Sequence, residues 1–169
     1  MAEDLRLTPG LAREERYKEI LPQIAAVISD ETDTIANLAN IAAILKEAFG
    51  FFWVGFYRLK EGELVLGPFQ GPLACTRISL DRGVCGAAAS AKQTIIVPDV
   101  EKFPGHIACS SASRSEIVVP LVAEEQTILV LDVDSDQYND FSETDQYYLG
   151  QLMEMVRSVY QLPENQRVS

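Results

Sequence analysis

Apolar side chains recur at helical spacing near both ends of the chain, and this pattern constrains the fold more than any other feature. One such stripe covers residues 13–29, a second covers 34–49, and a third runs from Ser142 to about residue 161. Residues three and four positions apart lie on one face of a helix. Gly50 follows the second stripe where a left-handed cap residue is expected. We therefore predict three helices, each with one buried face.

Between these helices the chain alternates with the two-residue period of strands. Because Pro120 cannot donate a ladder hydrogen bond, its strand should lie at an edge or be bulged there. The expected fold class is α/β (α+β), a single domain with a central antiparallel sheet and the N- and C-terminal helices packed together on one face. The predicted strands cover 51–59, 63–66, 73–80, 94–97, 116–122 and 127–133, with a loop over 67–72 and a short Ala-rich helix over 85–91.

Length and composition narrow the functional classes. A chain of 169 residues forms one domain with a real core. We expect a flexible lead-in over 1–12, the domain over 13–162 and a tail over 163–169. The net charge of −11 argues against binding to nucleic acid. We find no membrane-spanning run and no secretory signal. Together with an odd count of 3 cysteines, this favours the reducing cytoplasm.

A loop over residues 103–116 carries the clearest candidate for chemistry. It holds His106 and, three residues later, Cys109, followed by a run of small residues. A nucleophilic thiol needs partial exposure and a field that lowers its pKa, which His106 or Arg114 could supply. A second thiol within reach would convert an oxidised Cys109 into a disulfide. The alternative is that Cys109, like the other two cysteines, is a buried, inert side chain.

Zinc binding is a competing interpretation of the same residues. Cys75, Cys85, His106 and Cys109 are four possible ligands. Structural zinc sites usually contain closely spaced ligand pairs, and here only His106 and Cys109 are close in sequence. We therefore expect no metal ion at these residues.

Three carboxylates are expected to converge at one end of the sheet. Asp132 and Asp134 are two residues apart in an otherwise apolar strand, so both point to one face. A hairpin with its turn at 123–126 would bring Glu116 beside them. Such a cluster suits a cationic amine and could hold an acid with a raised pKa. Solvated charges at strand ends are the alternative.

Two aromatic residues share one face of the first predicted strand. Trp53 and Tyr57 are four residues apart, with Gly55 between them. Ordinary core packing is the simpler interpretation. The glycine could also leave an apolar slot beside the carboxylates, which suits a small amphiphile.

Several segments together resemble a known family. They are Gly67-Pro68-Phe69-Gln70-Gly71, Ala74-Cys75, Arg82-Gly83-Val84-Cys85-Gly86, Phe103-Pro104-Gly105-His106-Ile107-Ala108-Cys109 and Ser115-Glu116-Ile117-Val118. This combination resembles the free methionine-(R)-sulfoxide reductases, stand-alone GAF domains, over roughly residues 15 to 160. The resemblance implies a GAF fold and suggests a homodimer.

The resemblance also implies roles for individual residues. Cys109 would be the nucleophile, Cys75 the resolving thiol and Cys85 an auxiliary thiol. Trp53 and Tyr57 would form the pocket for the methyl group on sulfur. The substrate-binding carboxylates would be Glu116, Asp132 and Asp134.

The implied function is reduction of free L-methionine (R)-S-oxide to L-methionine by an oxidoreductase. Cys109 would pass through a sulfenic acid to a disulfide, and thioredoxin would regenerate the thiols, with neither a metal nor an organic cofactor required. The rival hypothesis is a non-catalytic GAF module that senses a small ligand or the redox state. A Cys109→Ser variant separates them, because a sensor would keep its ligand binding.

Overall fold

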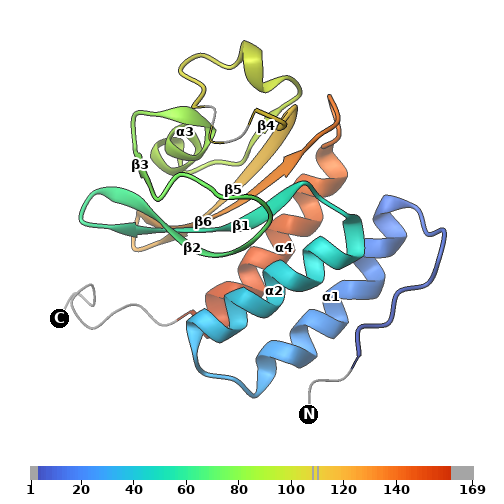
Figure 1. Ribbon diagram of the computed structural model, residues 1–169. Coiled ribbons are helices and arrows are strands. Elements are labelled where there is room, and N and C mark those ends of the chain that lie inside the picture. The colour runs from blue at the N-terminus through green and yellow to red at the C-terminus, as the bar shows by residue number, and fades with distance from the viewer. Residues whose placement is uncertain (1–3, 108, 110, 161–169) are drawn as a thin grey trace.

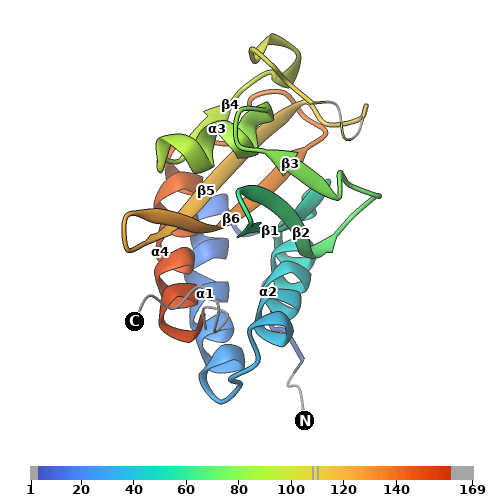
Figure 2. The same ribbon diagram turned by 90° about the vertical axis from the view of Figure 1, so that its left-hand side faces the viewer.

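The computed structural model describes residues 4–107, 109 and 111–160, which form a curled sheet between two layers of helix (Figure 1). Helices α1, α2 and α4 cover one face of the sheet and α3 lies over the other (Figure 2). The elements are α1 (Arg13–Ser29), α2 (Thr34–Phe49), β1 (Trp53–Lys60), β2 (Glu63–Gln70), β3 (Arg77–Ser79), α3 (Gly83–Ala91), β4 (Ile95–Val97), η1 (Val100–Lys102), β5 (Ser115–Ala123), β6 (Gln126–Ser135) and α4 (Glu143–Val159).

The three predicted terminal helices are confirmed, and local capping fixes their ends. The side chain of Asp33 accepts a hydrogen bond from the Ala36 amide at 2.9 Å at the start of α2. Gly50 ends that helix at φ 67°, a conformation that glycine adopts at little cost. Ser142 and Asp145 form a reciprocal capping box at the start of α4. None of the helices in the described part of the chain is long and apolar enough to cross a membrane.

The predicted single antiparallel sheet, with terminal helices on one face, is also confirmed. Its six strands run in the order β3-β2-β1-β6-β5-β4. All five neighbouring pairs are antiparallel. Pro120 lies on β5, which is not an edge strand, but the pairing of β5 with β6 shifts between Leu121 and Val122, as the bulge alternative predicted. On the other side β4 pairs with residues 116–118, and among the described strands none reaches Pro120 there.

Two predicted boundaries in the middle of the chain were wrong. Residues 67–70, expected in a loop, continue β2 and pair with β1 across an irregularity between Gly55 and Tyr57. Such a bulge absorbs an extra residue and lets pairing continue. Conversely, only Arg77–Ser79 of the predicted strand 73–80 is a strand, so Cys75 lies in a loop.

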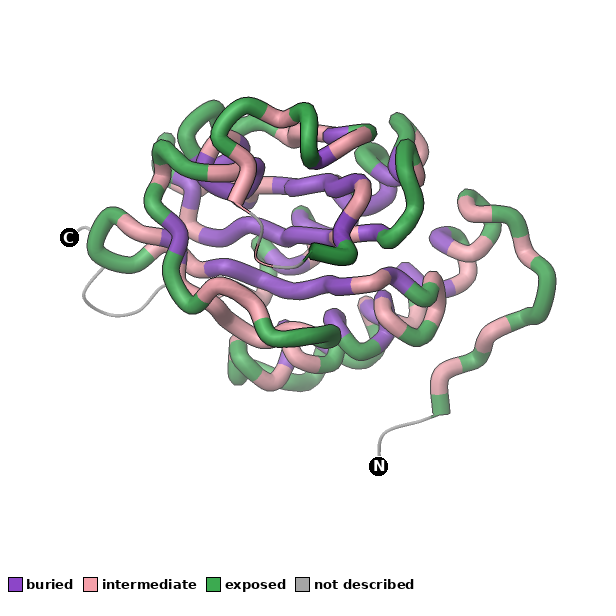
Figure 3. Tube along the Cα trace, turned by 45° about the horizontal axis from the view of Figure 1, so that its top comes forward, coloured by how far each residue is buried: buried purple, intermediate pink, exposed green. Residues whose placement is uncertain are grey.

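The sheet separates two apolar cores, which Figure 3 shows as buried chain on both sides of the strands. The larger core joins α1, α2 and α4 to the sheet through residues such as Ile24, Leu45 and Leu152. The smaller core lies under α3 and contains Trp53, Tyr57 and Cys85. The first core therefore supports the sheet from behind, and the second surrounds the side that carries the candidate chemistry.

The predicted lead-in over residues 1–12 and the predicted tail can be compared with the structure only in part. Residues 4–12 run beside α1, where the Arg6 amide donates to Gln23 at 2.8 Å and the Thr8 amide to Glu19 at 3.0 Å. The flexibility expected for residues 1–12 stays a prediction. The predicted tail over 163–169 lies outside the described residues.

Gly55 provides a test of how tightly β1 and β2 pack. A Cβ atom there would lie 2.3 Å from Cβ of Phe69 and 2.6 Å from Cη2 of Trp53. Gly55→Ala should therefore lower the free energy of unfolding by about 1–3 kcal/mol. Gly150, inside α4, has no atom within 4 Å of that position, so Gly150→Ala should raise stability by roughly 0.5–1 kcal/mol. Urea unfolding of both variants measures this, and a Gly55→Ala protein as stable as the wild type would contradict the packing.

Candidate active site

Strand register brings the three carboxylates to one place on the sheet. Glu116 on β5 lies opposite Asp134 on β6, and Asp134 lies opposite Trp53 on β1. Asp132 lies opposite Gly55 one step along the same face. Directly opposed residues point to the same side of a sheet. The predicted convergence is thus present, on the face that α3 covers, and the alternative of solvated charges is wrong for Glu116 and Asp132, each 7% exposed.

Burial sets the protonation of this carboxylate cluster, defined as Glu116, Asp132 and Asp134. Loss of solvent raises the pKa of Asp132 to about 6, and hydrogen bonds from Cys85 and Glu116 oppose the rise. Burial, followed by repulsion from Asp132, raises the pKa of Glu116 and of Asp134 well above the usual range. A hydrogen bond from Ser113 Oγ partly offsets the effect at Asp134. Asp132 is therefore the member that ionises first, and the other two hold their protons longer.

Cys85 faces the same cluster from α3. Its thiol is buried and free, and burial together with the charges of Asp132 and Glu116 raises its pKa. The thiol sulfur and one oxygen each of Glu116 and Asp132 all lie within 4.8 Å of one another. Cys85 is thus a partner of the carboxylates in this structure rather than a partner of another cysteine.

Cys75 and Cys109 form a disulfide across 34 residues of sequence, with their Cα atoms 5.5 Å apart. This is the pairing that the family resemblance implies. Two ligands of the alternative zinc site are thereby bonded to each other and cannot bind a metal in this form. Both cysteines are half-buried, so the disulfide lies at the edge of the pocket rather than in the core.

Trp53 and Tyr57 hold the loop that carries Cys75. The Trp53 indole donates to the carbonyl of Pro72 at 3.1 Å, and the Tyr57 hydroxyl donates to the carbonyl of Cys75 at 2.9 Å. The space above Gly55 is not the open slot that the sequence suggested, because Trp53 and Phe69 fill it. The aromatic pair therefore forms one wall of the pocket and positions its disulfide as well.

The two candidate cations near Cys109 have different positions. His106 lines the pocket, and the backbone nearby is held by a hydrogen bond of 3.1 Å from the Gly83 amide to the carbonyl of Gly105. Arg114 does not line it, because its side chain pairs with Glu101 at 3.3 Å and lies over the ring of Tyr138. Among the described residues that line the pocket there is no Lys or Arg.

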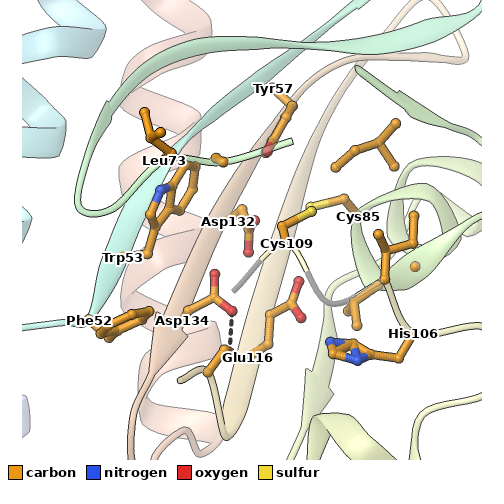
Figure 4. Close-up of a pocket in the computed structure, with 16 residues that line it drawn as sticks. Phe52, Trp53, Tyr57, Leu73, Cys85, His106, Cys109, Glu116, Asp132 and Asp134 are labelled. Atoms are coloured by element: carbon orange, nitrogen blue, oxygen red, sulfur yellow. Dashed lines mark hydrogen bonds between the residues drawn. The ribbon is translucent and has the colours of Figure 1, made fainter. Parts of the chain in front are cut away.

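Figure 4 shows how these groups face one another. Asp132, Asp134 and Glu116 extend into the pocket toward Cys109, with Trp53 and Tyr57 on one side and His106 on another. Sequence reasoning did not assign a role to Ser113, which donates to Asp134, or to Phe52 and Leu73 in the lining. Ser113 lies two residues before β5 and close to Glu116 in sequence, and this proximity could have identified it as a residue of the site. Nothing in the local pattern marks Phe52 or Leu73.

Comparisons of the sequence and of the structure with known proteins agree with one another. The GAF domain family matches residues 29–158. The chain is 59% identical to a GAF domain-containing protein A of Dictyostelium discoideum, over 92% of this chain and 99% of that protein. It is 45% identical to a free methionine-R-sulfoxide reductase of Escherichia coli, over 86% and 88% of the two chains. The structure of the Neisseria meningitidis free methionine-R-sulfoxide reductase in complex with its substrate superposes with a TM-score of 0.91 at 54% identity, covering 94% of this chain and 95% of that one.

The raised pKa of Asp132 predicts a stability cost that depends on pH. Between about pH 4 and pH 6 the carboxyl is protonated in the folded chain and ionised in the unfolded chain, so stability falls as pH rises through this window. Asp132→Asn removes that cost and should stabilise the protein by about 1–3 kcal/mol at pH 8, with a smaller gain at pH 5. Urea unfolding across this range measures the difference. Asp30→Asn, on an exposed carboxylate, is the matched control, and a gain at Asp132 that does not change with pH would contradict the account.

Proposed function

The chain belongs to the GAF domain family and, within it, to the free methionine-(R)-sulfoxide reductases, and from this premise we propose that it reduces free L-methionine (R)-S-oxide to L-methionine. It is then an oxidoreductase that acts on a sulfur group. The observation that carries the proposal is the Cys75–Cys109 disulfide at the edge of a pocket lined by two buried carboxylates and a third, half-buried one. A redox-active sulfur pair and a site for an ammonium group are what this substrate requires.

The first chemical step uses Cys109 in the reduced protein. Its thiolate attacks the sulfoxide sulfur while the oxygen takes up a proton, because an unprotonated oxide is a poor leaving group. Hydroxyl transfers to the cysteine sulfur, methionine leaves, and Cys109 becomes a sulfenic acid. The sulfoxide is reduced by two electrons, and the cysteine is oxidised by the same two.

The second step forms the disulfide present in the structure. The Cys75 thiol attacks the sulfenic sulfur, a sulfur–sulfur bond forms, and water leaves. The two Cα atoms are 5.5 Å apart, within the usual range for such a bond. An external dithiol, which we assign to thioredoxin, then reduces the disulfide by thiol exchange. The half-buried position of both cysteines leaves the bond within reach of a partner.

We assign different roles in binding and proton transfer to the members of the carboxylate cluster. Asp132 ionises most readily, so we assign it to the substrate ammonium. Glu116 and Asp134 keep their protons at higher pH, and a negative Asp132 reinforces this. One of these two is the proton donor for the sulfoxide oxygen, a role that a buried carboxylic acid fills near neutral pH. The methyl group on sulfur packs against Trp53 and Tyr57.

The same cluster explains selection for the free amino acid. A methionine sulfoxide inside a peptide has no α-ammonium group, so the buried charge of Asp132 would be left without a partner. Leaving a buried charged group unpaired costs roughly 3 kcal/mol or more. The reducing cytoplasm is the compartment that we assign to the reaction, because regeneration needs a supply of dithiol. A homodimer stays a prediction.

Substrate comparison tests this function. With thioredoxin, thioredoxin reductase and NADPH, the protein should turn over the free R epimer and leave the S epimer unchanged. N-acetylation of the R epimer removes the positive charge and should lower kcat/KM by on the order of 100-fold or more. Equal rates on the acetylated and free substrates would contradict the role of the carboxylates. No methionine from either epimer, with ligand binding retained, would favour the sensor hypothesis instead.

A further inference from the structure

Cys85 is a buried thiol that the proposed catalytic cycle does not use. The disulfide joins the other two cysteines, and Cys85, 3% exposed, faces Glu116 and Asp132. These three side chains come from three different elements, namely α3, β5 and β6. One sulfur and two carboxylate oxygens lie within 4.8 Å of one another. A thiol and two carboxylates at this separation form a donor set that a cation could bridge.

The environment of Asp132 points to a missing ligand. The residue is only 7% exposed, and no described residue donates a hydrogen bond to its buried Oδ1 atom, so the contacts with Cys85 and Glu116 leave this oxygen unsatisfied. A buried carboxylate oxygen without a partner is costly, and a bound cation would satisfy it. Figure 4 shows the Asp132 carboxyl group directed into the pocket toward the other acidic side chains.

The donor types select the class of cation. A sulfur ligand favours zinc and similar borderline-soft ions over magnesium and calcium, which prefer all-oxygen sites. Zinc lies about 2.3 Å from sulfur and about 2.1 Å from carboxylate oxygen, so tetrahedral ligands are roughly 3.5 Å apart. The present separations are within 4.8 Å, so small side-chain rotations bring the three atoms to binding distance.

We propose that Cys85, Glu116 and Asp132 bind one Zn²⁺ ion, with water in the remaining position, and that this ion excludes the substrate ammonium group from the pocket. Binding converts the Cys85 thiol to a thiolate and releases its proton. Zinc would then be an inhibitor of the enzyme rather than a cofactor. The inhibitory consequence rests on the proposed function, whereas the metal site itself does not.

Charge balance gives the reason for the competition. Metal binding releases the protons of Cys85 and Glu116, and the site then carries three negative charges that no Lys or Arg among the described lining residues offsets. A divalent cation compensates more of this charge than the single charge of an ammonium group. Both ligands need the same Asp132 oxygen atoms, so they cannot bind together.

The disulfide form allows a clean binding test, because Cys85 is then the one thiol in the chain that can ligate. Zinc is added to the oxidised protein without chelator or reductant, and bound metal is measured by equilibrium dialysis. We expect one ion per chain, and a loss of affinity by on the order of 100-fold in Cys85→Ser and in Asp132→Asn. Asp30→Asn, at an exposed carboxylate that follows the last residue of α1, is the matched control and should bind like the wild type.

Cobalt as a probe reports the sulfur ligand directly. Co²⁺ bound by a thiolate shows a charge-transfer absorption in the near ultraviolet, which should be present in the wild type and absent in Cys85→Ser. Circular dichroism confirms that each variant is folded. Saturable zinc binding that is unchanged in a folded Cys85→Ser, or no saturable binding in the wild type, overturns the site.

The competitive effect is tested in the same oxidised protein. Free methionine (R)-sulfoxide should raise the apparent Kd for zinc in proportion to its concentration, and N-acetylated sulfoxide should not. Zinc binding that the free sulfoxide leaves unchanged overturns the competition. A chain that binds zinc through Cys85 but yields no methionine in turnover assays would contradict the proposed function and leave the metal site standing, so the two failures are distinguishable.

Discussion

Two buried carboxylates, Glu116 and Asp132, share one face of the sheet with the half-buried Asp134, and their removal from water governs the chemistry of the pocket. Desolvation raises the pKa of all three, and repulsion from Asp132 adds to the rise at Glu116 and Asp134. Among the described lining residues no Lys or Arg offsets these shifts. This arrangement opposes folding at neutral pH, yet it supplies both a proton donor and a site for a cation. Stability is given up at this position in exchange for a function.

The scaffold compensates for that cost on the opposite face. Helices α1, α2 and α4 pack a continuous apolar core against β1, β5 and β6, and β5 and β6 carry the three carboxylates on their other side. The hairpin of β5 and β6 is paired along nearly its whole length, so Glu116 and Asp134 have little freedom to separate. Trp53 and Tyr57 then connect this rigid sheet to the loop of Cys75 by two hydrogen bonds. The sheet therefore holds the carboxylates in place, whereas the disulfide that they face is carried on loops.

Local patterns predicted the helices, the antiparallel sheet and the meeting of Glu116 with Asp132 and Asp134, because periodicity and a hairpin determine these features over short distances in the chain. The continuation of β2 through residues 67–70 was missed, since a bulge is needed to keep it paired with β1. The position of Cys85 beside Asp132 was also missed. That contact joins α3 to β6, and no local pattern specifies how a short helix lies across a sheet. The family resemblance supplied the cysteine pairing, which spacing alone does not determine.

Whether the carboxylates and the cysteine pair act together on a free amino acid can be decided by a single-turnover experiment. Fully reduced protein is mixed anaerobically with free methionine (R)-sulfoxide, without thioredoxin, and methionine and free thiols are counted per chain. We expect about one methionine formed and about two thiols lost, with peptide mapping placing the new disulfide at Cys75 and Cys109. Methionine formation with a disulfide that includes Cys85, or with no loss of thiols, would contradict it.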